Sequence, residues 1–449
     1  MKNIDMKEAI ALCKSAEALS SEEKEILVKK RLCELVFYAK DHSAYFKKLY
    51  KNIEKGFAIT DLTPVAKTGL MESYEDWVTD PQINFQELMD YIHSDAALTT
   101  LYLDKYSAIT TSGTTGEPMP MVRDSYHNTI HGALMQTRLL RNVDPNALNP
   151  KYHKLGAVIF LNPSVSSYSG FEKMRVANKQ YEDNLLAISL EEKLSTIVEK
   201  LNQFQPDTLT AYPSVLGALS NEQKMGRLKI HPQVLACSAE LLTKPVYNTL
   251  RDTFGCVVLN NYCSTEGGEA AMSCECGELH INDDWIIIEP VDKDGNPTKP
   301  GEWSDGIYIT DLTNYVQPII RYYMNDKVKI SHGCACGSSL PVMNIMGRVG
   351  NNITVGGKEI IGINIDYLLT YIEGVYNLQL VQTSDRRFEF RAVFAYGQDK
   401  LKIFNEVKDI LKKFFDDHEC GPVEITLSDQ PPKHSERGGK IKRVVKEFD

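Results

Sequence analysis

The sequence predicts a two-domain α/β protein, and three observations support this. The chain has 449 residues, enough for two or three folding units with sizeable cores. Between about 105 and 258, short apolar runs alternate with stretches patterned as helices, which is typical of an α/β domain. After Gly347 the pattern changes to three strands around one helix, which indicates a small α+β module. We therefore expect a large multi-sheet α/β domain over 1–346 and a small α+β domain over 347–449.

The first hundred residues read mostly as helix. Ser20–Leu32 opens with Ser-Ser-Glu-Glu, an N-cap signature, and then places apolar residues at near-helical spacing. The α/β part follows, with buried strands expected at Leu155–Leu161, Leu209–Tyr212, Val234–Cys237 and Cys256–Leu259.

The pattern from 285 to 330 predicts antiparallel sheet. Gly306–Leu312 and Lys327–Ile330 alternate apolar and polar residues, and Asp294-Gly295 is a hairpin-type turn. The small module contains a predicted helix, Lys400–Asp416, and predicted strands at Leu378–Gln382, Phe388–Phe394 and Val423–Leu427.

Composition excludes several classes of protein. Charged residues make up 24% and hydrophobic residues 43%, which fits neither a disordered chain nor a coiled coil. The 60 acidic and 50 basic residues give a net charge of −10, which argues against nucleic-acid binding. No apolar run is long enough to span a membrane, and Met1–Lys14 does not read as a secretory signal. We expect a cytoplasmic protein without nucleic-acid or membrane partners.

The strongest local signal is the glycine- and hydroxyl-rich loop of residues 110–118, Thr-Thr-Ser-Gly-Thr-Thr-Gly-Glu-Pro. Glycines let backbone N–H groups turn towards an anion, and hydroxyls add further donors, so the loop suits a polyphosphate. No Lys-Ser/Thr pair follows Gly116, which disfavours a P-loop NTPase. An ordinary Ser/Thr/Gly turn is the alternative interpretation.

A second polar cluster, Asn260–Glu266, follows a predicted buried strand. The carboxyl ends of such strands are where α/β sheets bind ligands. Tyr262 could stack on a purine, Thr265 could donate to a phosphate and Glu266 could hold Mg²⁺. A structural role for the cluster is the alternative.

Taken in order, these motifs resemble the adenylate-forming superfamily over about residues 105–449. Within it, the chain looks most like the phenylacetate-coenzyme A ligase family, whose phosphate loop lacks the usual trailing Lys, as here with Met119. The further motifs that carry the resemblance are Cys237–Glu240, Tyr262–Glu266, Ile320-Arg321-Tyr322 with Asp326, Gly347-Arg348, and Gly439-Lys440.

The resemblance implies a nucleotide site. The loop that would wrap the β- and γ-phosphates of ATP comprises Thr111, Ser112, Gly113, Thr114, Thr115 and Gly116. The residues that would frame the adenine are Ser238, Ala239, Glu240, Asn261 and Tyr262. Asp326 would take the ribose hydroxyls, and Arg348 would contact ribose or phosphate near the interdomain hinge.

The resemblance also assigns catalytic roles. Thr265 would touch the α-phosphate, Glu266 would bind Mg²⁺, and Lys440 would bridge the attacking carboxylate and the α-phosphate. A carboxylate that approaches a polyanion needs such a cation. The small domain would rotate after adenylation about a hinge near Gly347–Asn351. A mobile surface lysine in a basic tail is the alternative for Lys440.

Three positions depart from the family pattern. Gly350 and Asn351 stand where the hinge motif has two acidic residues, which leaves the control of rotation open. Cys263 replaces a glycine, and the motif that ends at Asp326 lacks its second arginine.

The ten cysteines include two copies of Cys-x-Cys-Gly. Together Cys274, Cys276, Cys334 and Cys336 supply four thiolates, a set that suits structural zinc. By resemblance to other members of the ligase family, three cysteines with His280 form an alternative ligand set. Four reduced thiols without metal are the remaining alternative.

These residues predict an AMP-forming acid–thiol ligase that uses ATP, Mg²⁺ and a small carboxylic acid, with coenzyme A as the expected acceptor. The alternatives are the phosphopantetheine arm of an acyl carrier protein, an amine, or adenylation without transfer. A non-catalytic, zinc-stabilised nucleotide-binding protein is the alternative from another class. Tyr168 and Tyr212, with Phe171, are candidate walls of the acyl pocket. The sequence leaves the acid, the acceptor and the choice between monomer and homodimer open.

Overall fold

The computed structural model describes residues 3–111, 118–162, 165–348, 353–360, 365, 368–369, 372–395, 397–433 and 441–448. Most of the phosphate loop (112–117), the hinge positions Gly350 and Asn351, and Lys440 lie outside the described residues. For Arg348 only the backbone is described.

The amino-terminal hundred residues are helical, as predicted. The helix α2 is longer than the predicted segment, and its Ser20–Glu23 capping box satisfies backbone N–H groups at the first turn. The helices of this part are α1 (Met6–Glu17), α2 (Ser21–His42), α3 (Ala44–Leu49), η1 (Ile59–Asp61), α4 (Lys67–Met71), α5 (Tyr74–Trp77), α6 (Phe85–Ile92) and α7 (Ala96–Thr99).

A nine-stranded sheet forms the middle of the molecule, in the order β13-β14-β9-β8-β7-β6-β5-β3-β4. The pairs from β7 to β4 are parallel and those from β13 to β7 are antiparallel, so the sheet changes character at β7. Its strands are β3 (Leu155–Ile159), β4 (Leu185–Ser189), β5 (Thr208–Ala211), β6 (Val234–Cys237), β7 (Val257–Ser264), β8 (Gly268–Ser273), β9 (Leu279–Ile281), β13 (Asp326–Ser331) and β14 (Val342–Arg348).

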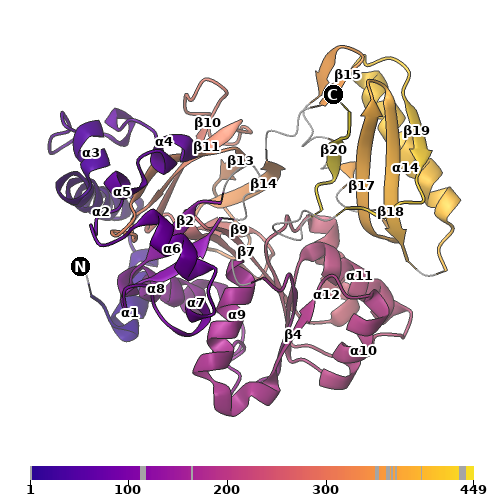
Figure 1. The fold of residues 1–449 in the computed structure, drawn as a ribbon, viewed down its shortest axis with the longest axis horizontal. Helices are drawn as coiled ribbons and strands as arrows, with labels where there is room; N and C mark the ends of the chain where they lie inside the picture. The colour runs from indigo at the N-terminus through magenta and orange to yellow at the C-terminus, as the bar shows by residue number, and fades with distance from the viewer. Residues whose placement is uncertain are drawn as a thin grey trace.

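The parallel part has the predicted alternation of strands and helices. Its intervening helices are α9 (Ser166–Ala177), η3 (Lys179–Asn184), α10 (Leu194–Phe204), α11 (Pro213–Lys224) and α12 (Lys244–Phe254). Figure 1 shows α10, α11 and α12 gathered on one side of these strands, with α9 apart from them. The strands carry near-continuous buried residues because helices cover both faces.

Two smaller sheets precede and follow this part. The antiparallel pair β1 (Ser107–Thr110) and β2 (Pro120–Arg123) flanks the phosphate loop and leads into α8 (Ser125–Leu134) and the π-helical segment η2 (Met135–Leu139). The predicted antiparallel region of 285–330 is confirmed as a three-stranded sheet of β10 (Ile286–Val291), β11 (Gly306–Asp311) and β12 (Ile319–Met324), followed by β13.

One element differs from the prediction in a way that matters for the site. The expected strand Cys256–Leu259 continues as β7 to Ser264, so Asn260–Cys263 lie within a strand and not after it. The reason is that β8 turns back on β7 and pairs with it, which supplies hydrogen-bond partners to a segment that reads as a loop.

Residues 353–446 form a unit with its own hydrophobic core, separate from the cores of the preceding residues. A four-stranded sheet in the order β19-β18-β17-β20 packs against α14 (Lys400–Asp417). The strands of this sheet are β17 (Val375–Ser384), β18 (Arg387–Phe394), β19 (Glu424–Leu427) and β20 (Val444–Lys446). A separate antiparallel pair is formed by β15 (Ile353–Val355) and β16 (Lys358–Ile360). The predicted small α+β module is thus present, while its boundary at 346/347 stays a prediction.

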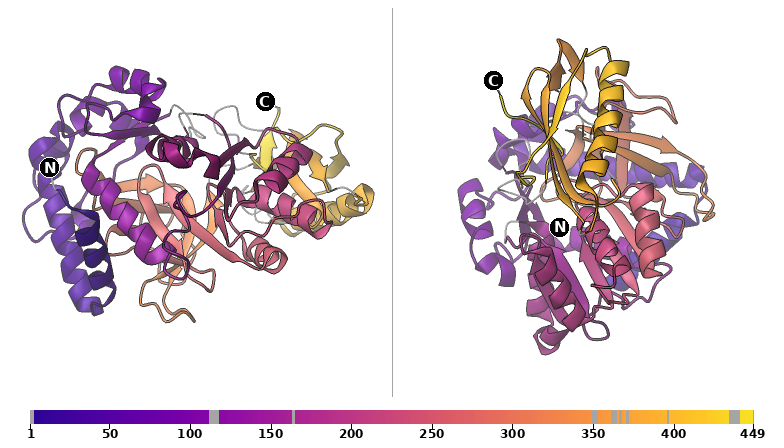
Figure 2. Two further views of the ribbon diagram at one scale, coloured as in Figure 1. Left: turned by 90° about the horizontal axis from the view of Figure 1, so that it is seen from below. Right: turned by 90° about the vertical axis from the view of Figure 1, so that its right-hand side faces the viewer.

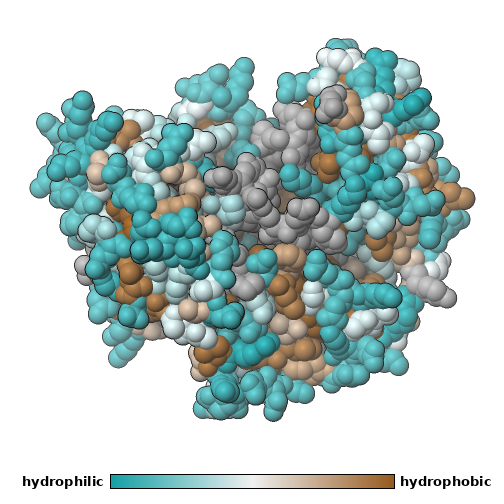
Figure 3. Space-filling view, viewed as in Figure 1, coloured by the Kyte–Doolittle hydropathy of each residue, from teal (hydrophilic) through white to brown (hydrophobic). Residues whose placement is uncertain are grey.

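The amino-terminal helices and this carboxyl-terminal unit lie at opposite ends of the molecule (Figures 1 and 2). Buried ion pairs connect the amino-terminal helices to the central sheet region. Asp284 Oδ1 lies 2.8 Å from Arg138 Nη1, Asp284 Oδ2 lies 3.8 Å from Arg31 Nη1, and all three residues are buried. The face shown in Figure 3 is mainly hydrophilic, with apolar residues in small patches. Among the helices of the described ranges, none is both long and apolar enough to cross a bilayer.

Candidate active site

The turn between β7 and β8 carries Thr265 and Glu266, two of the predicted catalytic residues. The guanidinium of Arg123 holds this turn, because its Nη2 donates to the Thr265 carbonyl oxygen at 2.8 Å. Tyr322 Oη donates to Glu266 Oε1 at 3.5 Å. A Cβ atom at Gly267 would lie 2.3 Å from Cδ1 of Ile309, so a larger residue here would require the Ile309 side chain to shift.

Tyr262 and Asp326, 64 positions apart, meet beside this turn. Tyr262 Oη donates a hydrogen bond to Asp326 Oδ2 at 2.7 Å. Asp326 begins β13 and pairs in register with the backbone of Arg348 on β14. Tyr262, Asp326 and the backbone of Arg348 are therefore close together at one end of the antiparallel part of the sheet.

The predicted adenine residues Ser238, Ala239 and Glu240 follow β6 at its carboxyl end. Ala239 has a positive φ of 65°, a conformation that non-glycine residues rarely adopt and that is frequent at ligand sites. Glu240 Oε2 accepts a hydrogen bond from the Ser214 backbone N–H at 3.2 Å, which fixes the segment against the start of α11. Asn261 lies half-buried on β7 beside Tyr262.

Of the phosphate loop, the structure describes Thr111. This residue is buried, its N–H donates to the Met119 carbonyl at 2.9 Å, and its Oγ1 accepts from the Met119 N–H at 3.0 Å. These two bonds close the base of the loop. The predicted residues Ser112, Gly113, Thr114, Thr115 and Gly116 lie outside the described residues.

The chain next to Lys440 lies near the adenine segment. Ile441 and Arg443 line a cavity of about 50 Å³ together with Ser214, Glu240 and Tyr376. Tyr376 of β17 also donates to Glu222 of α11, so the carboxyl-terminal unit contacts the parallel part of the sheet here.

The candidate acyl-pocket residues form a small cluster under α9. Tyr168 and Phe171 pack against Tyr212 and against the β3 residues Ala157 and Ile159. Burial raises the pKa of Tyr212 to about 12, so its hydroxyl stays protonated. Tyr212 is 2% exposed, which makes it part of the core, whereas Tyr168 is half-buried.

The two Cys-x-Cys-Gly turns come together at the edge of β9 and β14. Four side chains place their ligand atoms within 4.8 Å of one another: Cys274, His280, Cys334 and Cys336. The sulfurs of Cys274 and Cys334 are 3.8 Å apart, and Cys336 Sγ lies 3.4 Å from His280 Nε2. Ligand atoms at the corners of a tetrahedron around zinc, with bonds of about 2.3 Å, would be about 3.8 Å apart.

His280 is oriented for this role. Its Nδ1 contacts the Leu340 carbonyl oxygen at 3.0 Å, which leaves the lone pair on Nε2 to face the thiols. Cys276 does not belong to this group of four. Of the two ligand sets that the sequence left open, the geometry favours three cysteines with His280, and a tetrahedral zinc ion fits this donor set.

Comparison with known proteins identifies the fold. No family model matches the chain. Protein CapK of Staphylococcus aureus is 25% identical over 228 residues, and this match spans about half the length of each chain, 49%. The structure of 2-hydroxyisobutyryl-CoA ligase in the postadenylation state, in complex with 2-HIB-AMP, superposes with a TM-score of 0.68 and 18% identity over 96% of this chain and 90% of that one. The protein has the fold of the adenylate-forming ligases.

Other solved structures of this fold are less similar. The same CoA ligase in the thioesterification state, with 2-HIB-AMP and CoA, gives a TM-score of 0.56 at 18% identity, over 96% of this chain and 91% of that one. The anthranilate CoA ligase AuaEII gives 0.50 at 13% identity, over 74% and 65% of the two chains. The present structure of the adenylate-forming fold is thus more like the postadenylation state of the first enzyme than its thioesterification state.

Sequence reasoning missed a buried polar network beneath the Thr265–Glu266 turn of this adenylate-forming fold. It runs from Glu269 on β8 through His131 and His127 on α8 to Asp311 on β11. His131 Nδ1 lies 2.6 Å from Glu269 Oε2, and His127 Nδ1 lies 3.2 Å from Asp311 Oδ2.

Hydrogen bonds to Thr313 account for the close approach of the two histidines and Asp311. The atoms within hydrogen-bond distance of Thr313 Oγ1 are His127 Nδ1 at 2.7 Å, His131 Nε2 at 3.1 Å and Asp311 Oδ1 at 2.5 Å. Although these three residues are of metal-ligating types, the hydroxyl lies among them. We interpret the cluster as a hydrogen-bonded network and not as a metal centre.

The histidines of the network differ in charge. Burial lowers the pKa of His127, with help from the charge of His131, to about 4. Burial also disfavours the charged form of His131. The hydrogen bonds of His131 to Asp311 and Glu269 outweigh the effect of burial and raise the pKa of His131 to about 9. At neutral pH the network therefore holds a neutral His127 and a protonated His131.

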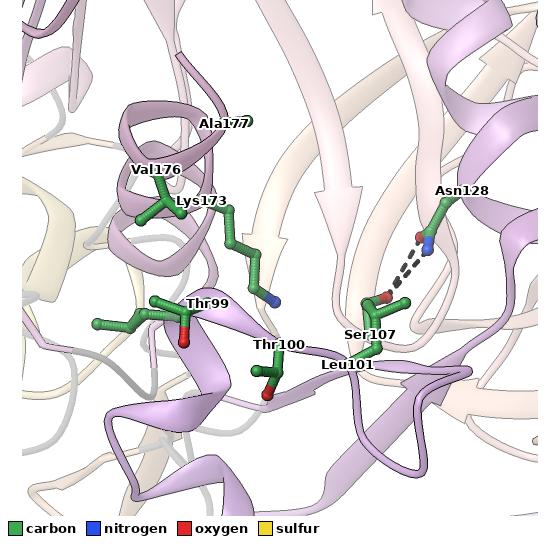
Figure 4. Close-up of a pocket in the computed structure, with 9 residues that line it drawn as sticks. Thr99, Thr100, Leu101, Ser107, Asn128, Lys173, Val176 and Ala177 are labelled. Carbon is green, nitrogen blue, oxygen red and sulfur yellow. Dashed lines mark hydrogen bonds between the residues drawn. The ribbon is translucent and has the colours of Figure 1, made fainter. Parts of the chain in front are cut away.

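A separate cavity of about 590 Å³ lies away from these residues (Figure 4). It is lined by parts of α7, α8 and α9 and by the start of β1, and Lys173 reaches into it towards Thr99 and Thr100. Ser107 and Asn128, which hydrogen-bond to each other, close its other side. None of the predicted site residues lines this cavity.

Proposed function

We propose that the protein is an AMP-forming ligase that activates a small carboxylic acid with ATP and passes the acyl group to a thiol, with coenzyme A as the acceptor. In the first step the carboxylate oxygen forms a bond to the α-phosphorus, and the bond from that phosphorus to pyrophosphate breaks. In the second step the thiol sulfur attacks the acyl carbon, AMP leaves with its oxygen, and the thiol proton passes to solvent.

The observation that carries this proposal is the convergence of the motif residues at one place. Tyr262 and Asp326 are hydrogen-bonded to each other, and the turn with Thr265 and Glu266 begins three residues after Tyr262. Glu240 lies three residues beyond the end of the nearby strand β6. In the proposal, Tyr262 and Glu240 hold the nucleoside, Thr265 donates to the α-phosphate, and Glu266 holds the Mg²⁺ that offsets the phosphate charge.

The small domain from residue 347 supplies Lys440 in this proposal. Its neighbour Ile441 shares a cavity with Glu240, so the lysine joins the chain close to the proposed nucleotide site. A cation there would reduce the repulsion between the carboxylate and the triphosphate. The Cys274, His280, Cys334 and Cys336 group would hold a structural zinc ion that fixes β9 to the 334–337 turn.

The test is acid-dependent pyrophosphate release from Mg·ATP, measured over a panel of aryl, branched and straight-chain acids. The informative pair of variants is Lys440→Ala and Lys442→Ala, because Lys442 is exposed and only two residues away. We expect release to fall by about a hundredfold or more in the first variant and to stay within about twofold of the wild type in the second. Mass spectrometry of the products with coenzyme A present tests the transfer step.

Three results would contradict the proposal. If ATP binds but no acid in the panel supports release, the protein is a nucleotide-binding protein and not a ligase. If both lysine variants lose activity equally, Lys440 has no special role. If the acyl-adenylate forms and coenzyme A gives no thioester, the acceptor is a carrier protein or an amine.

A further inference from the structure

The carboxylate of Glu269 lies at the boundary between the buried network and the exposed side of the β7–β8 hairpin. Glu269 stands directly across from Cys263 in the antiparallel register. Its side chain is 21% exposed, and Cys263 is exposed as well. One end of the network can therefore be reached from outside it.

The two oxygens of this carboxylate have unequal partners. Oε2 lies 2.6 Å from His131 Nδ1, in a charge-assisted bond. Oε1 has the Cys263 thiol at 3.8 Å, and sulfur is a weak donor. Within the described ranges, no stronger donor is bonded to Oε1.

At neutral pH the Glu269 carboxyl group is ionised and the Cys263 thiol is protonated. Burial opposes ionisation of Glu269, but its bond to His131 and the charges of His131 and Arg123 outweigh burial and lower its pKa to about 2. Burial and the neighbouring Glu269 raise the pKa of the Cys263 thiol. The site thus presents an ionised carboxylate whose Oε1 retains capacity to accept a strong hydrogen bond.

This oxygen lies close to the proposed reaction centre. Cys263 is two residues before Thr265, which is about 7 Å along a strand at about 3.3 Å per residue. Arg123 binds the Thr265 carbonyl and also contributes to the charge around Glu269. An acid whose carboxylate reacts beside Thr265 would direct its other end past Cys263 towards Glu269.

We propose that Glu269 is a specificity-determining residue that accepts a hydrogen bond from the acid, so the acid carries a hydroxyl or ammonium group besides its carboxylate. This inference rests on the proposed function, because that function places the acid beside Thr265. An acid without such a group would displace water from Oε1 and leave the Glu269 carboxylate without a hydrogen-bond donor in its place. Such an acid would therefore bind more weakly.

The experiment measures binding, so that it does not depend on turnover. The probes are non-hydrolysable acyl-sulfamoyl adenosines in matched sets: propanoyl, lactoyl and alanyl; and butanoyl, 4-hydroxybutanoyl and 4-aminobutanoyl. Isothermal titration calorimetry gives the Kd of each probe for the full chain. We expect the best hydroxyl or ammonium probe to bind at least about tenfold more tightly than its unsubstituted partner.

Three variants locate the effect. Glu269→Met removes both oxygens at similar side-chain length and should reduce this preference below about threefold. Since it also leaves His131 without a partner, Cys263→Val serves as a second variant that covers Oε1 at an exposed position and should likewise reduce the preference at least fivefold. Asp283→Asn removes a carboxylate of similar exposure (27%) that is paired with Lys24, and should leave the preference unchanged.

Each outcome decides the point. A preference for hydroxyl probes or for ammonium probes that disappears in Glu269→Met and Cys263→Val supports the inference and identifies the group. Equal binding within every set, or a preference that survives in both variants, overturns it. If the probes show the preference while no acid supports pyrophosphate release, the proposed ligase function fails and the inference about Glu269 stands. If AMP binds and no acyl probe binds, the proposed function and the inference about Glu269 both fail.

Discussion

The stability of the large domain should fall as the pH rises from about 6.5 to 9, and His131 should be the cause. The pKa of this histidine is about 9 in the folded protein against an ordinary value of 6.5. Between these values the folded state binds a proton that the unfolded state has lost, so its contribution is present in full below pH 6.5 and is lost as the pH passes 9. The proposed perturbation is His131→Gln, which removes this titration.

The expected magnitude follows from the two pKa values. A pKa difference of about 2.5 at about 1.4 kcal/mol per pKa unit corresponds to about 3.5 kcal/mol. About 2 kcal/mol of this is lost between pH 7 and pH 9. Solvent screening reduces this free-energy contribution only slightly, because the His131 side chain is 6% exposed.

Urea unfolding of the full chain at pH 7, 8 and 9 measures this loss, with the fluorescence of the tryptophans reporting on the large domain. Trp77, Trp285 and Trp303 all lie in that part of the chain. The free energy of unfolding of the wild type should decrease by about 2 kcal/mol more than that of His131→Gln over this range. Asp283→Asn is the control, because a carboxylate does not titrate here.

Parallel pH dependences in the wild type and in His131→Gln would refute the reasoning. They would mean that His131 is neutral in the folded protein at pH 7, and that the ion pair with Glu269 does not exist as an ion pair. A steeper dependence in the variant would have the same meaning.

Two further predictions concern the metal group and the buried ion pairs. Elemental analysis should find one zinc ion per chain in the wild type and in Cys276→Ser but none in Cys336→Ser, and equal zinc in both variants would contradict the ligand set with His280. Asp284→Asn should lower the free energy of unfolding by about 3–5 kcal/mol in urea, because it removes the carboxylate charge beside buried Arg31 and leaves buried Arg138 with Glu17. A loss below about 1 kcal/mol would show that water or other groups already compensate those arginines.

Local patterns in the sequence determined most of the secondary structure. The Ser20–Glu23 cap, the buried strand Val234–Cys237 and the helix Lys400–Asp417 are found within a residue or so of their predicted bounds. Each depends on neighbours a few residues away, through capping, periodicity or a run of apolar side chains, so a single segment contains the information.

The motifs likewise determined the candidate site by type and order. Tyr262, Asp326 and Glu266 were predicted as nucleotide and magnesium residues, and the structure brings the first two into direct contact with the third nearby. The chemistry of these side chains is local, which is why the sequence could indicate candidate roles for them before their neighbours were known; the roles themselves stay predictions.

Only the tertiary structure decided the pairings between distant segments. The extension of β7 to Ser264 depends on β8, and the choice of His280 over Cys276 depends on how β9 meets β14. The network of Glu269, His131 and Asp311 joins a strand, a helix and another sheet. None of these contacts leaves a periodic signal in the sequence, because each is created when separate elements pack and share one buried space.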